Sequence, residues 1–446
     1  MSDVVVPEDV RATDCARSVP AARAGYHRTE LGMLPQDWRI KAISAIANVK
    51  TGPFGSALHE RDYVDHGTPI VTVEHLSEHG IRHQNLPLVS DRDRHRLKGY
   101  LLRRGDIVFS RVGSVDRNSL VSQDEDGWLF SGRLLRIRIS SENLTSARYL
   151  SYHLHTESFK KRVHSLAVGQ TMASLNTEIL RAVQVVLPHV LEQRAIASVL
   201  TDVDELIGSL EALVAKKRDV KHATIQQLLT GTTRLPEFGG EWSRGRLGDL
   251  ARLHREHVVP DPAIDELYVH FSLPAYDSGQ HPTMEAGSAI RSGKFRVPSE
   301  AILVSRLNPR IPRVWAPKCA GPNAIASTEF LVLTPRTCAN RMFLYSLCSS
   351  PQFWERMVLA VTGTTGSHQR VNRDDAMKLP IRFPEDPSEQ RAIATVLSDM
   401  DAEITALEHR LDKTRAIKQG MMQQLLTGSI RLPIPEDDTS DNDHDA

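Results

Sequence analysis

The residues best suited to chemistry are polar side chains in three glycine-containing loops, residues 50–56, 169–176 and 363–372. Two arginines, Arg111 and Arg306, each follow a serine at the end of an expected strand. Arg, Gln, Asn, Ser and Thr side chains read base edges and hold phosphates in nucleic-acid complexes. Ordinary surface turns have the same composition, so composition alone leaves both interpretations open. The candidate DNA-facing residues are Thr51, Ser56, Arg111, Gln170, Thr171, Ser174, Asn176, Arg306, Gln369, Arg370 and Asn372.

The sequence lacks the short motifs that several kinds of enzyme require. It has no Gly-x-x-x-x-Gly-Lys-Ser/Thr loop for ATP and no Gly-x-Gly-x-x-Gly segment at the start of a helix. An Asn-Pro-Pro-aromatic run, typical of amino-methyltransferases, is also missing. His254 and His257 have the wrong spacing for two zinc ligands on one helix face, and the four cysteines form no ligand pairs. We therefore predict a non-catalytic chain without a metal or cofactor of its own.

The formal net charge of the 446 residues is zero, but the charge is unevenly spread. Lys and Arg exceed Asp and Glu by roughly six in residues 38–187 and again by roughly six in residues 242–384, whereas residues 434–446 carry about −6. Basic segments favour a polyanionic partner, although solvated surface Lys and Arg explain such an excess nearly as well. The chain has no apolar run that could span a bilayer and no secretory apolar core, so we expect a cytoplasmic protein without a membrane partner.

One stretch of the chain occurs twice. Glu192–Ala197 returns as Glu389–Ala394, and Gln226–Gly231 returns as Gln423–Gly428. At this fixed offset about 25 of roughly 45 positions are identical, which indicates an internal duplication. Apolar residues in each copy step by four and three, and this heptad pattern predicts two long helices packed as an antiparallel coiled coil. The expected packing residues are Ile196, Leu200, Val203, Ile207, Leu210, Val214, Ile393, Leu397, Met400, Ile404, Leu407 and Leu411.

Both ends of these helices carry sequence signals. Ser388 is expected as the N-cap of the second helix, and Gly231 and Gly428 lie where a left-handed C-terminal cap is expected. About 38 residues at ~1.5 Å per residue make a rod of about 57 Å. The apolar stripe then meets Lys217 and Lys221 in the first copy, and Thr414 and Lys418 in the second. We therefore expect the packing seam to change face in the second half of each helix.

Two dissimilar segments separate the copies, and each has strand-like runs followed by a helix-like run. Each opens with Leu-Pro…Trp, at Leu34–Trp38 and Leu235–Trp242. The predicted fold class is α+β, with two globular α/β domains separated by two long helices in a pseudo-two-fold arrangement. The expected boundaries are a disordered N-terminus at 1–28, domain one at 29–187, helix one at 188–234, domain two at 235–386, helix two at 387–433 and an acidic disordered tail at 434–446.

These doubled motifs resemble the DNA specificity subunit of type I restriction-modification enzymes. The similarity covers about residues 29–433 and rests on the Glu-Gln-Arg-Ala-Ile-Ala openings, the Gln-Gln-Leu-Leu-Thr-Gly endings and the Leu-Pro…Trp segments. Residues 51–56 and 105–111 also resemble the family. Domain two departs from the family because it lacks a Gly-Pro-Phe-Gly-Ser segment and has Ser299–Ala301 where Gly-Asp is expected.

The resemblance implies that each globular domain is a target recognition domain reading one half of a bipartite, asymmetric site in double-stranded DNA. It implies that the helices set the spacing and dock methyltransferase subunits, one for each half, which restriction/translocase subunits then join. S-adenosylmethionine, ATP and Mg²⁺ are then expected on those partners, and this chain is expected to be non-enzymatic. The alternative is a coiled-coil protein–protein scaffold whose domains do not read DNA.

Overall fold

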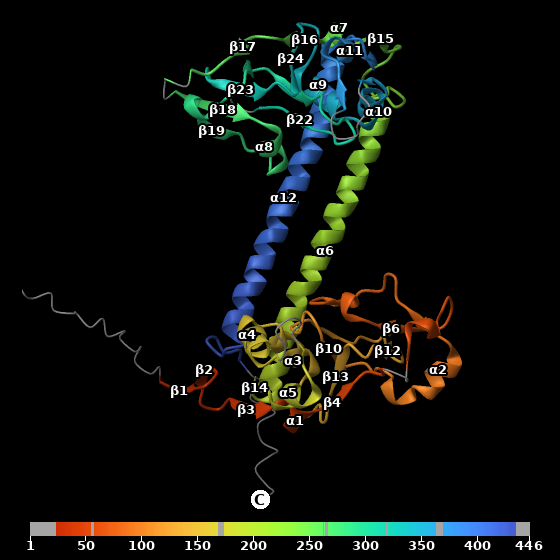
Figure 1. The fold of residues 1–446 in the computed structure, drawn as a ribbon, viewed down its shortest axis with the longest axis vertical. Coiled ribbons are helices and arrows are strands. Elements are labelled where there is room, and N and C mark those ends of the chain that lie inside the picture. The colour runs from red at the N-terminus through yellow and green to blue at the C-terminus, as the bar shows by residue number, and fades with distance from the viewer. Residues whose placement is uncertain are drawn as a thin grey trace, which may run out of the picture. The chain divides into compact units, whose positions relative to one another are not determined.

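The chain forms two compact units, whose ribbons are drawn in Figure 1. Unit 1 comprises Met1–Gly208 and Asp412–Ala446, and unit 2 comprises Ser209–Leu411. Each unit therefore holds one globular domain and a part of both long helices. The computed structural model describes residues 24–54, 58–167, 174–261, 263, 266–317, 320–362 and 369–433.

The globular part of unit 1 is built from short strands and short helices. Its strands are β1 (Tyr26–Thr29), β2 (Gly32–Pro35), β3 (Arg39–Ala42), β4 (Ala47–Thr51), β5 (Tyr63–Val64), β6 (Thr68–Val71), β7 (Leu76–Ser77), β8 (Gly80–Ile81), β9 (Leu88–Val89), β10 (Ile107–Ser110), β11 (Asn118–Leu120), β12 (Leu129–Phe130), β13 (Leu134–Ile139) and β14 (Gln184–Leu187). Its helices are α1 (Ile43–Ile46), η2 (Glu60–Asp62), η3 (Val73–His75), α2 (Asp91–Arg96), η4 (Lys98–Tyr100), α3 (Ala147–Leu154), α4 (Glu157–Leu166) and α5 (Thr177–Ala182).

Unit 2 has the same general composition. Its strands are β15 (Ser243–Arg246), β16 (Ala251–His254), β17 (His257–Val258), β18 (Leu267–Phe271), β19 (Thr283–Ala286), β20 (Lys294–Arg296), β21 (Ile302–Ser305), β22 (Val314–Trp315), β23 (Ala324–Ser327), β24 (Phe330–Pro335), β25 (Val361–Thr362), β26 (Arg370–Val371) and β27 (Pro380–Phe383). Its helices are α7 (Leu247–Leu250), α8 (Leu273–Asp277), η5 (Gly287–Ala289), α9 (Arg341–Ser349), α10 (Pro351–Leu359) and α11 (Arg373–Met377).

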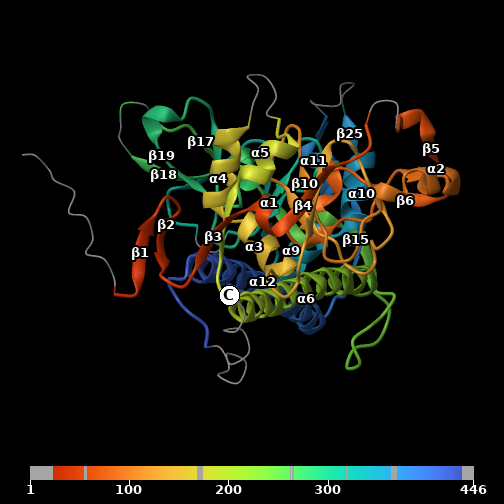
Figure 2. The ribbon, with the colours of Figure 1, turned by 90° about the horizontal axis from the view of Figure 1, so that it is seen from below.

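The main sheet of unit 1 is antiparallel, with the strand order β11-β10-β13-β4. Side chains alternate between the two faces of a strand. Phe109 and Leu135 therefore point to one face, where they share a core with Tyr149 of α3. Val108 and Leu134 point to the other face and belong to a second core. The helices α3, α4 and α5 lie together beside the sheet in Figure 2, and the sheet thus separates two cores.

Unit 2 repeats this plan. Its main sheet has the order β16-β24-β21-β22, which corresponds strand by strand to β4-β13-β10-β11. The second sheet differs between the units. Unit 1 has one of four strands, β12-β6-β9-β5, whereas unit 2 has one of five, β17-β20-β23-β18-β19. The two domains therefore share a frame and differ in what is built on it, which confirms the predicted α+β class.

The two long helices are α6 (Val190–Leu228) and α12 (Pro387–Leu425), each of 39 residues. In unit 1 the start of α6 shares a core with the end of α12, through Leu200 and Met422. In unit 2 the end of α6 shares a core with the start of α12, through Leu228 and Leu397. The predicted antiparallel packing is therefore confirmed. The expected packing residues that are buried are Ile196, Leu200, Ile207, Leu210, Val214, Ile393, Leu397, Ile404 and Leu411, and Val203, Met400 and Leu407 are half-buried.

The expected change of face in the second half of the helices is wrong for α12. Thr414 and Lys418 are buried on the stripe that Leu411 and Met422 also occupy. Lys418 stays there because its Nζ forms an ion pair with Asp204 Oδ1 at 2.6 Å within unit 1. A seam can therefore include a lysine when the facing helix supplies a carboxylate.

The repeated glutamate of the two helices holds a junction that is the same in both units. Glu192 is fully buried, accepts a hydrogen bond from the indole of Trp38 at 3.1 Å and pairs with Arg431 at 2.5 Å. Glu389 likewise accepts a hydrogen bond from Trp242 at 3.2 Å and pairs with Arg234 at 2.5 Å. The Glu, Arg-Leu-Pro and Leu-Pro…Trp motifs therefore each occur twice, because one copy of each meets at the junction of each unit.

The repeated glutamine next to that glutamate holds the residue that caps the start of α3 in unit 1 and of α9 in unit 2. Gln193 accepts a hydrogen bond from Ser146 N at 2.9 Å and donates to Pro188 O at 2.9 Å. Gln390 accepts from Asn340 N at 2.8 Å and donates to Pro384 O at 2.9 Å. Both amides are fully buried, so each long helix is locked to its domain at its first turn.

The glycines after the long helices have the predicted left-handed conformation, with φ of +71° at Gly231 and +70° at Gly428. A Cβ atom on Gly428 would also lie 2.5 Å from Pro35 Cγ, so the junction needs glycine for space as well as for φ.

Two expectations from the sequence, one about the start of α12 and one about the N-terminal residues, need correction. α12 begins at Pro387, and Asp386 Oδ1 accepts a hydrogen bond from Ser388 N at 2.8 Å, so Asp386 and not Ser388 caps the helix. Disorder was expected up to residue 28, but Tyr26–Thr29 pair with Gly32–Pro35. The Tyr26 hydroxyl donates to Gly428 O at 2.6 Å, which ties this hairpin to the end of α12.

Candidate nucleic-acid interface

In both units the loop after one central strand of the main sheet, β10 in unit 1 and β21 in unit 2, meets the loop that precedes the last short helix, α5 or α11. Leu175 N donates to Arg111 O at 2.8 Å in unit 1, and Val371 N donates to Arg306 O at 3.0 Å in unit 2. Isolated bridges continue the pairing at Val112–Ser174 and Leu307–Arg370. The backbone thus brings together the strand-end arginines and the polar loops that the sequence singled out separately.

In unit 1 this meeting point gathers Arg111, Thr51, Ser174 and Phe54. Arg111 Nη1 donates to Thr51 Oγ1 at 3.2 Å, and the guanidinium carbon lies 5.8 Å from the centroid of the Phe54 ring. Arg111 Nε is buried without a hydrogen-bond partner among the described residues. Phe54 is 62% exposed, so the cluster offers solvent an aromatic face beside a half-buried guanidinium.

The position of the Gly-Pro-Phe segment, residues 52–54, depends on steric limits at two glycines. A Cβ atom on Gly52 would lie 2.1 Å from the carbonyl oxygen of Ser131. A Cβ atom on Gly132 would lie 2.6 Å from Pro53 O and from Phe54 Cβ. The segment after β4 and the segment before β13 therefore approach so closely only because both positions are glycine, and this approach places Phe54 beside Arg111.

In unit 2 the equivalent point gathers Arg306, Gln369, Arg370 and an acidic residue. Arg306 Nε donates to Val371 O at 2.9 Å, and Asn308 N donates to Gln369 O at 2.8 Å. Burial and the charge of Arg373 lower the pKa of Arg306. Arg370 Nε pairs with Glu329 at 3.0 Å, and this hydrogen bond raises the pKa of Arg370. The frame is shared with unit 1, but the exposed chemistry is different.

Asn176 and Asn372 have a structural use at equivalent places. Asn176 Oδ1 accepts from Ile179 N at 2.7 Å and caps α5, and Asn372 Oδ1 accepts from Asp374 N at 2.9 Å and caps α11. Their carbonyl oxygens are therefore engaged, which leaves the amide nitrogens as the groups that can face a ligand. Three further candidates, Ser56, Gln170 and Thr171, lie outside the described residues.

Sequence reasoning missed three residues at these clusters. Arg111 N donates to Arg133 O at 2.9 Å, and Arg306 N donates to Glu329 O at 2.9 Å, so Arg133 and Glu329 occupy equivalent positions with opposite charge. Arg373 donates to Thr328 O at 2.8 Å, and its Nε has no partner among the described residues. The signal for Arg133 and Glu329 was their place immediately before the central strands β13 and β24.

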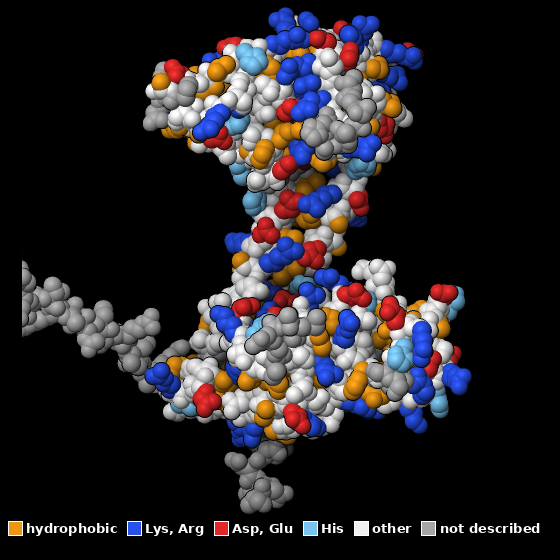
Figure 3. Space-filling model, in the orientation of Figure 1, with side chains coloured by type: hydrophobic (Ala, Val, Ile, Leu, Met, Phe, Trp, Pro, Cys, Tyr) orange, Lys and Arg blue, Asp and Glu red, His pale blue; other side chains and the backbone are white. Residues whose placement is uncertain are grey.

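On the face drawn in Figure 3, Lys and Arg side chains are interspersed with acidic side chains on both units. The charge on this face is therefore mixed. In the part of the chain that the structure describes, no group of three or more His, Cys, Asp and Glu side chains could hold a metal ion. Within the same described ranges, no helix is long and apolar enough to cross a membrane.

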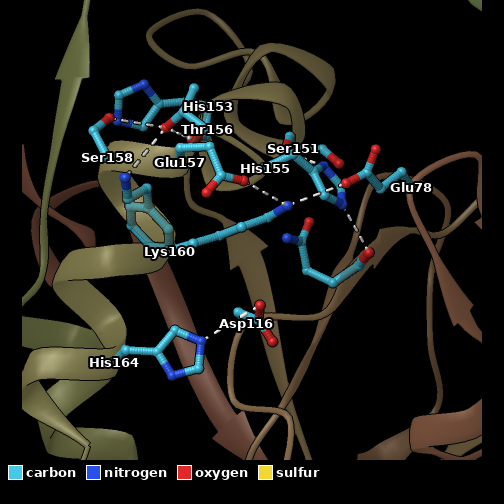
Figure 4. A network of polar contacts seen from close by, with 12 residues as sticks. Glu78, Asp116, Ser151, His153, His155, Thr156, Glu157, Ser158, Lys160 and His164 are labelled. Carbon is cyan, nitrogen blue, oxygen red and sulfur yellow. Dashed lines mark hydrogen bonds and ion pairs between the residues drawn. The ribbon is translucent and has the colours of Figure 1, made fainter. Parts of the chain in front are cut away.

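A network of polar contacts that includes histidines and carboxylates lies between α3, α4 and the β7–β8 hairpin of unit 1 (Figure 4). Lys160 Nζ lies 3.2 Å from Glu78 and 3.5 Å from Glu157. The His155 ring is 2.8 Å from Ser151 O and 3.1 Å from Asn118 O. Although burial opposes it, the charges of His155 and Lys160 lower the pKa of Glu78. These contacts tie the hairpin to the helices, and we assign them a structural role.

The model of one protein family, described as the type I restriction modification DNA specificity domain, matches residues 35–216. A putative type I restriction enzyme MjaX specificity subunit of Methanocaldococcus jannaschii is 28% identical over 210 residues, which are 46% of this chain and 48% of the relative. The MjaVIII specificity subunit of the same organism is 23% identical over 215 residues, which are 47% of this chain and 49% of the relative. The chain thus spans about half the length of the curated relatives it matches.

Solved structures extend the likeness to most of the chain. The crystal structure of a type I restriction-modification system S subunit from M. genitalium covers 87% of this chain and 96% of its own, with a TM-score of 0.56 and 14% identity. A chain from a study of complex assembly and conformational transition of the type I R-M system covers 89% of this chain and 99% of its own, with a TM-score of 0.51 and 15% identity. At these identities the structures establish the fold. Residues 35–216 are therefore similar to the type I restriction modification DNA specificity domain, and the fold over most of the chain is like that of the solved S subunit.

Proposed function

We propose that this chain is the sequence-reading subunit of a type I restriction-modification complex and that each globular domain reads one half of a bipartite, asymmetric DNA site. One observation carries the proposal: the same backbone frame presents different side chains in the two units. Unit 1 offers Arg111 with Phe54 and Arg133, and unit 2 offers Arg306 with the Arg370–Glu329 pair. Equal frames with unequal side chains suit two half-sites of different sequence.

The chemistry of the clusters fits base reading. An arginine with free donors binds O6 and N7 of guanine, and such a contact is worth about 1–3 kcal/mol of discrimination. Arg111 is half-buried and held beside Thr51 and Phe54, so its direction is set before a ligand arrives. In unit 2, Glu329 adds an acceptor that suits the amino group of cytosine or adenine.

The long helices suit a spacer and a docking element. Thirty-nine residues at ~1.5 Å per residue extend over about 58 Å, which is comparable to one to two turns of DNA at ~34–36 Å each. We propose that they set the distance between half-sites and bind methyltransferase subunits, one for each half. Methylation with S-adenosylmethionine, and ATP- and Mg²⁺-dependent translocation or cleavage by restriction subunits, are then the work of the partners.

The test is methylome sequencing of a host that carries the full chain and its methyltransferase partner. We expect a split, asymmetric methylated motif. Arg111→Ala should relax a position in one half only, and Arg306→Ala a position in the other half only. Lys41→Ala, which removes an exposed lysine of β3, is the matched control and should leave the motif unchanged.

The scaffold alternative makes a different prediction for the same experiment. If the domains do not read DNA, the complex still assembles, but the methylated sequence does not depend on either arginine. A stable, active complex whose methylated motif is identical for the wild type, Arg111→Ala and Arg306→Ala would contradict base reading by these two clusters.

A further inference from the structure

A second group of cations lies in unit 1 on the face of the main sheet opposite to α3. Lys50 of β4 is directly opposite Arg136 of β13, and Arg138 follows on the same face of β13. The segment around η4 borders this face. Lys50 Nζ donates to Gly99 O at 2.8 Å and lies 4.3 Å from the centroid of the Tyr100 ring. Three cations are therefore held on one face of the sheet, whereas Thr51, the next residue after Lys50, lies on the other face.

The acidic side chain of this group is already engaged. Asp106 is 1% exposed and accepts hydrogen bonds from Arg138 Nε at 2.7 Å and from Arg138 Nη2 at 2.6 Å. It also accepts one from the backbone nitrogen of Arg103 at 2.8 Å. One carboxylate thus balances one arginine, and the charges of Lys50 and Arg136 are left over.

Arg136 is the residue whose environment is incomplete. Its side chain is 5% exposed, and its Nε has no hydrogen-bond partner among the described residues. Burial and the charge of Arg138 lower the pKa of Arg136, and burial and the charge of Arg136 lower the pKa of Lys50. A buried cation with unsatisfied donors is costly unless an anion or an acceptor meets it.

Unit 2 shows that the frame does not require these cations. In the matching pair of strands, His254 of β16 is opposite Val332 of β24. Ala301 precedes β21 where Asp106 precedes β10, and Thr334 follows where Arg138 stands in unit 1. Unit 2 builds the same sheet without a charge at three of these four positions, so the group in unit 1 is not explained by folding alone.

We propose that Arg136 and Lys50, with the Arg138–Asp106 pair behind them, form a binding site for a phosphate-class oxyanion in unit 1. Arginine and lysine donors that converge at a partly buried place are the common recognition elements for phosphate. The oxyanion has two possible sources, a backbone phosphate of bound DNA or free phosphate. The site itself stands apart from the proposed function, and only the DNA source rests on it.

The first arm of the test measures thermal unfolding of the full chain in sodium phosphate and in sodium chloride of equal ionic strength. At phosphate concentrations a few times above Kd, the wild type should melt about 2–4 °C higher in phosphate. Arg136→Met should lose this rise. Lys50→Met, which changes a more exposed residue, should also lose most of it and serves if Arg136→Met does not fold. Lys41→Met should keep it.

The second arm measures the affinity of the same variants for a DNA duplex over a series of salt concentrations. If a backbone phosphate occupies the site, the slope of log Kd against log salt should fall by about one in Arg136→Met and Lys50→Met. If the phosphate-specific rise is lost while the slope is unchanged, the site takes free oxyanion. Wild-type chain that binds no DNA would contradict the proposed function and leave the first arm valid.

Two results would overturn the oxyanion site. One is a phosphate-specific rise in melting temperature that is equal in the wild type, Arg136→Met and Lys50→Met. The other is no phosphate-specific rise in the wild type together with salt slopes that are the same in all variants.

Discussion

Single buried charges explain why certain residues recur in this chain. Glu192 and Glu389 are buried at the starts of the long helices, where a lone carboxylate would be strongly destabilising. Each is therefore met by one arginine and one indole N–H, from Arg431 with Trp38 and from Arg234 with Trp242. Because the hydrogen bonds to Glu192 and Asp37 raise its pKa, Arg431 stays charged over the whole working range of pH.

The lowered pKa of His153 leads to a prediction of how the stability of unit 1 depends on pH. Burial, with a smaller effect of Arg162, lowers the pKa of His153 from 6.5 to about 4. The folded state therefore holds the neutral ring, while the unfolded state takes up a proton below about pH 6.5. Stability should be unaffected by this group above pH 6.5 and should fall by up to about 3 kcal/mol as the pH drops from 6.5 to 4.

Urea unfolding of the wild type and of His153→Gln at several pH values checks this. The wild-type midpoint should drop between pH 6.5 and 5, a range in which carboxylates remain largely ionised. The His153→Gln midpoint should change less over that range. Equal losses in the two proteins would show that another group causes the acid sensitivity.

At the scale of elements, one ion pair of the long helices occurs twice in different surroundings. Asp204 of α6 pairs with Lys418 of α12 in unit 1, and Asp401 of α12 pairs with Lys221 of α6 in unit 2. In unit 1 the Tyr152 hydroxyl also donates to Asp204 at 2.7 Å. Although burial opposes it, hydrogen bonds from His79, Lys418 and Tyr152 lower the pKa of Asp204 to about 2.

The same substitution in the two pairs should therefore have unequal effects. Lys418 is 5% exposed and Asp204 17%, whereas Lys221 is 24% exposed and Asp401 52%. Asp204→Asn leaves a buried lysine without its counter-charge and should destabilise unit 1 by about 3 kcal/mol. Asp401→Asn should cost less than about 1 kcal/mol. Chemical denaturation of both variants decides this, and similar losses would contradict the role assigned to burial.

The packing seam gives a second prediction for these elements. Leu200 is fully buried and Leu397 is 2% exposed. Replacing either with aspartate buries an unpaired carboxylate and should destabilise its unit by about 4 kcal/mol or more. Leu206→Asp is the control on the same helix, because Leu206 is 40% exposed. Soluble Leu200→Asp protein with the wild-type unfolding midpoint would refute the packing of α6 against α12.

How much of the molecule could be predicted from its sequence depends on how local each cause is. The heptad stripes, the glycine caps and the two-domain order are local or repeated patterns. The place of Lys418 was not predictable, because its partner Asp204 lies in the other long helix. The opposite charges of Arg133 and Glu329 were missed for a similar reason, since only the strand register shows that they are equivalent.

At the scale of the whole molecule, the duplication makes each unit depend on both copies. The core of unit 1 combines Leu34 and Trp38 from the N-terminal part of the chain with three residues from the end of α12 and just after it, Met422, Leu425 and Leu426. Unit 2, in contrast, is one continuous stretch, Ser209–Leu411. The two units should therefore respond differently to loss of the C-terminal part.

A chain that ends after Leu411 tests this dependence. Unit 1 loses the apolar end of α12, the Lys418 partner of Asp204 and the Arg431 partner of Glu192. Amide hydrogen exchange should then become fast in β3, β14 and the first turns of α6, because a buried carboxylate and an apolar face are uncovered. Unit 2 keeps its core and its Arg234–Glu389 pair, so protection in β15, β16 and β27 should be retained.

A chain that ends after Pro433 is the matched control, since it keeps every described contact of α12 and removes only residues 434–446, six of which are acidic. It should exchange as the full chain does. If truncation after Leu411 leaves protection in β3 and β14 unchanged, unit 1 folds without the C-terminal copy, and the joining of the two ends contributes little to its stability. If protection is lost equally in both units, the units unfold as one cooperative body, and their separate cores do not give them independent stability.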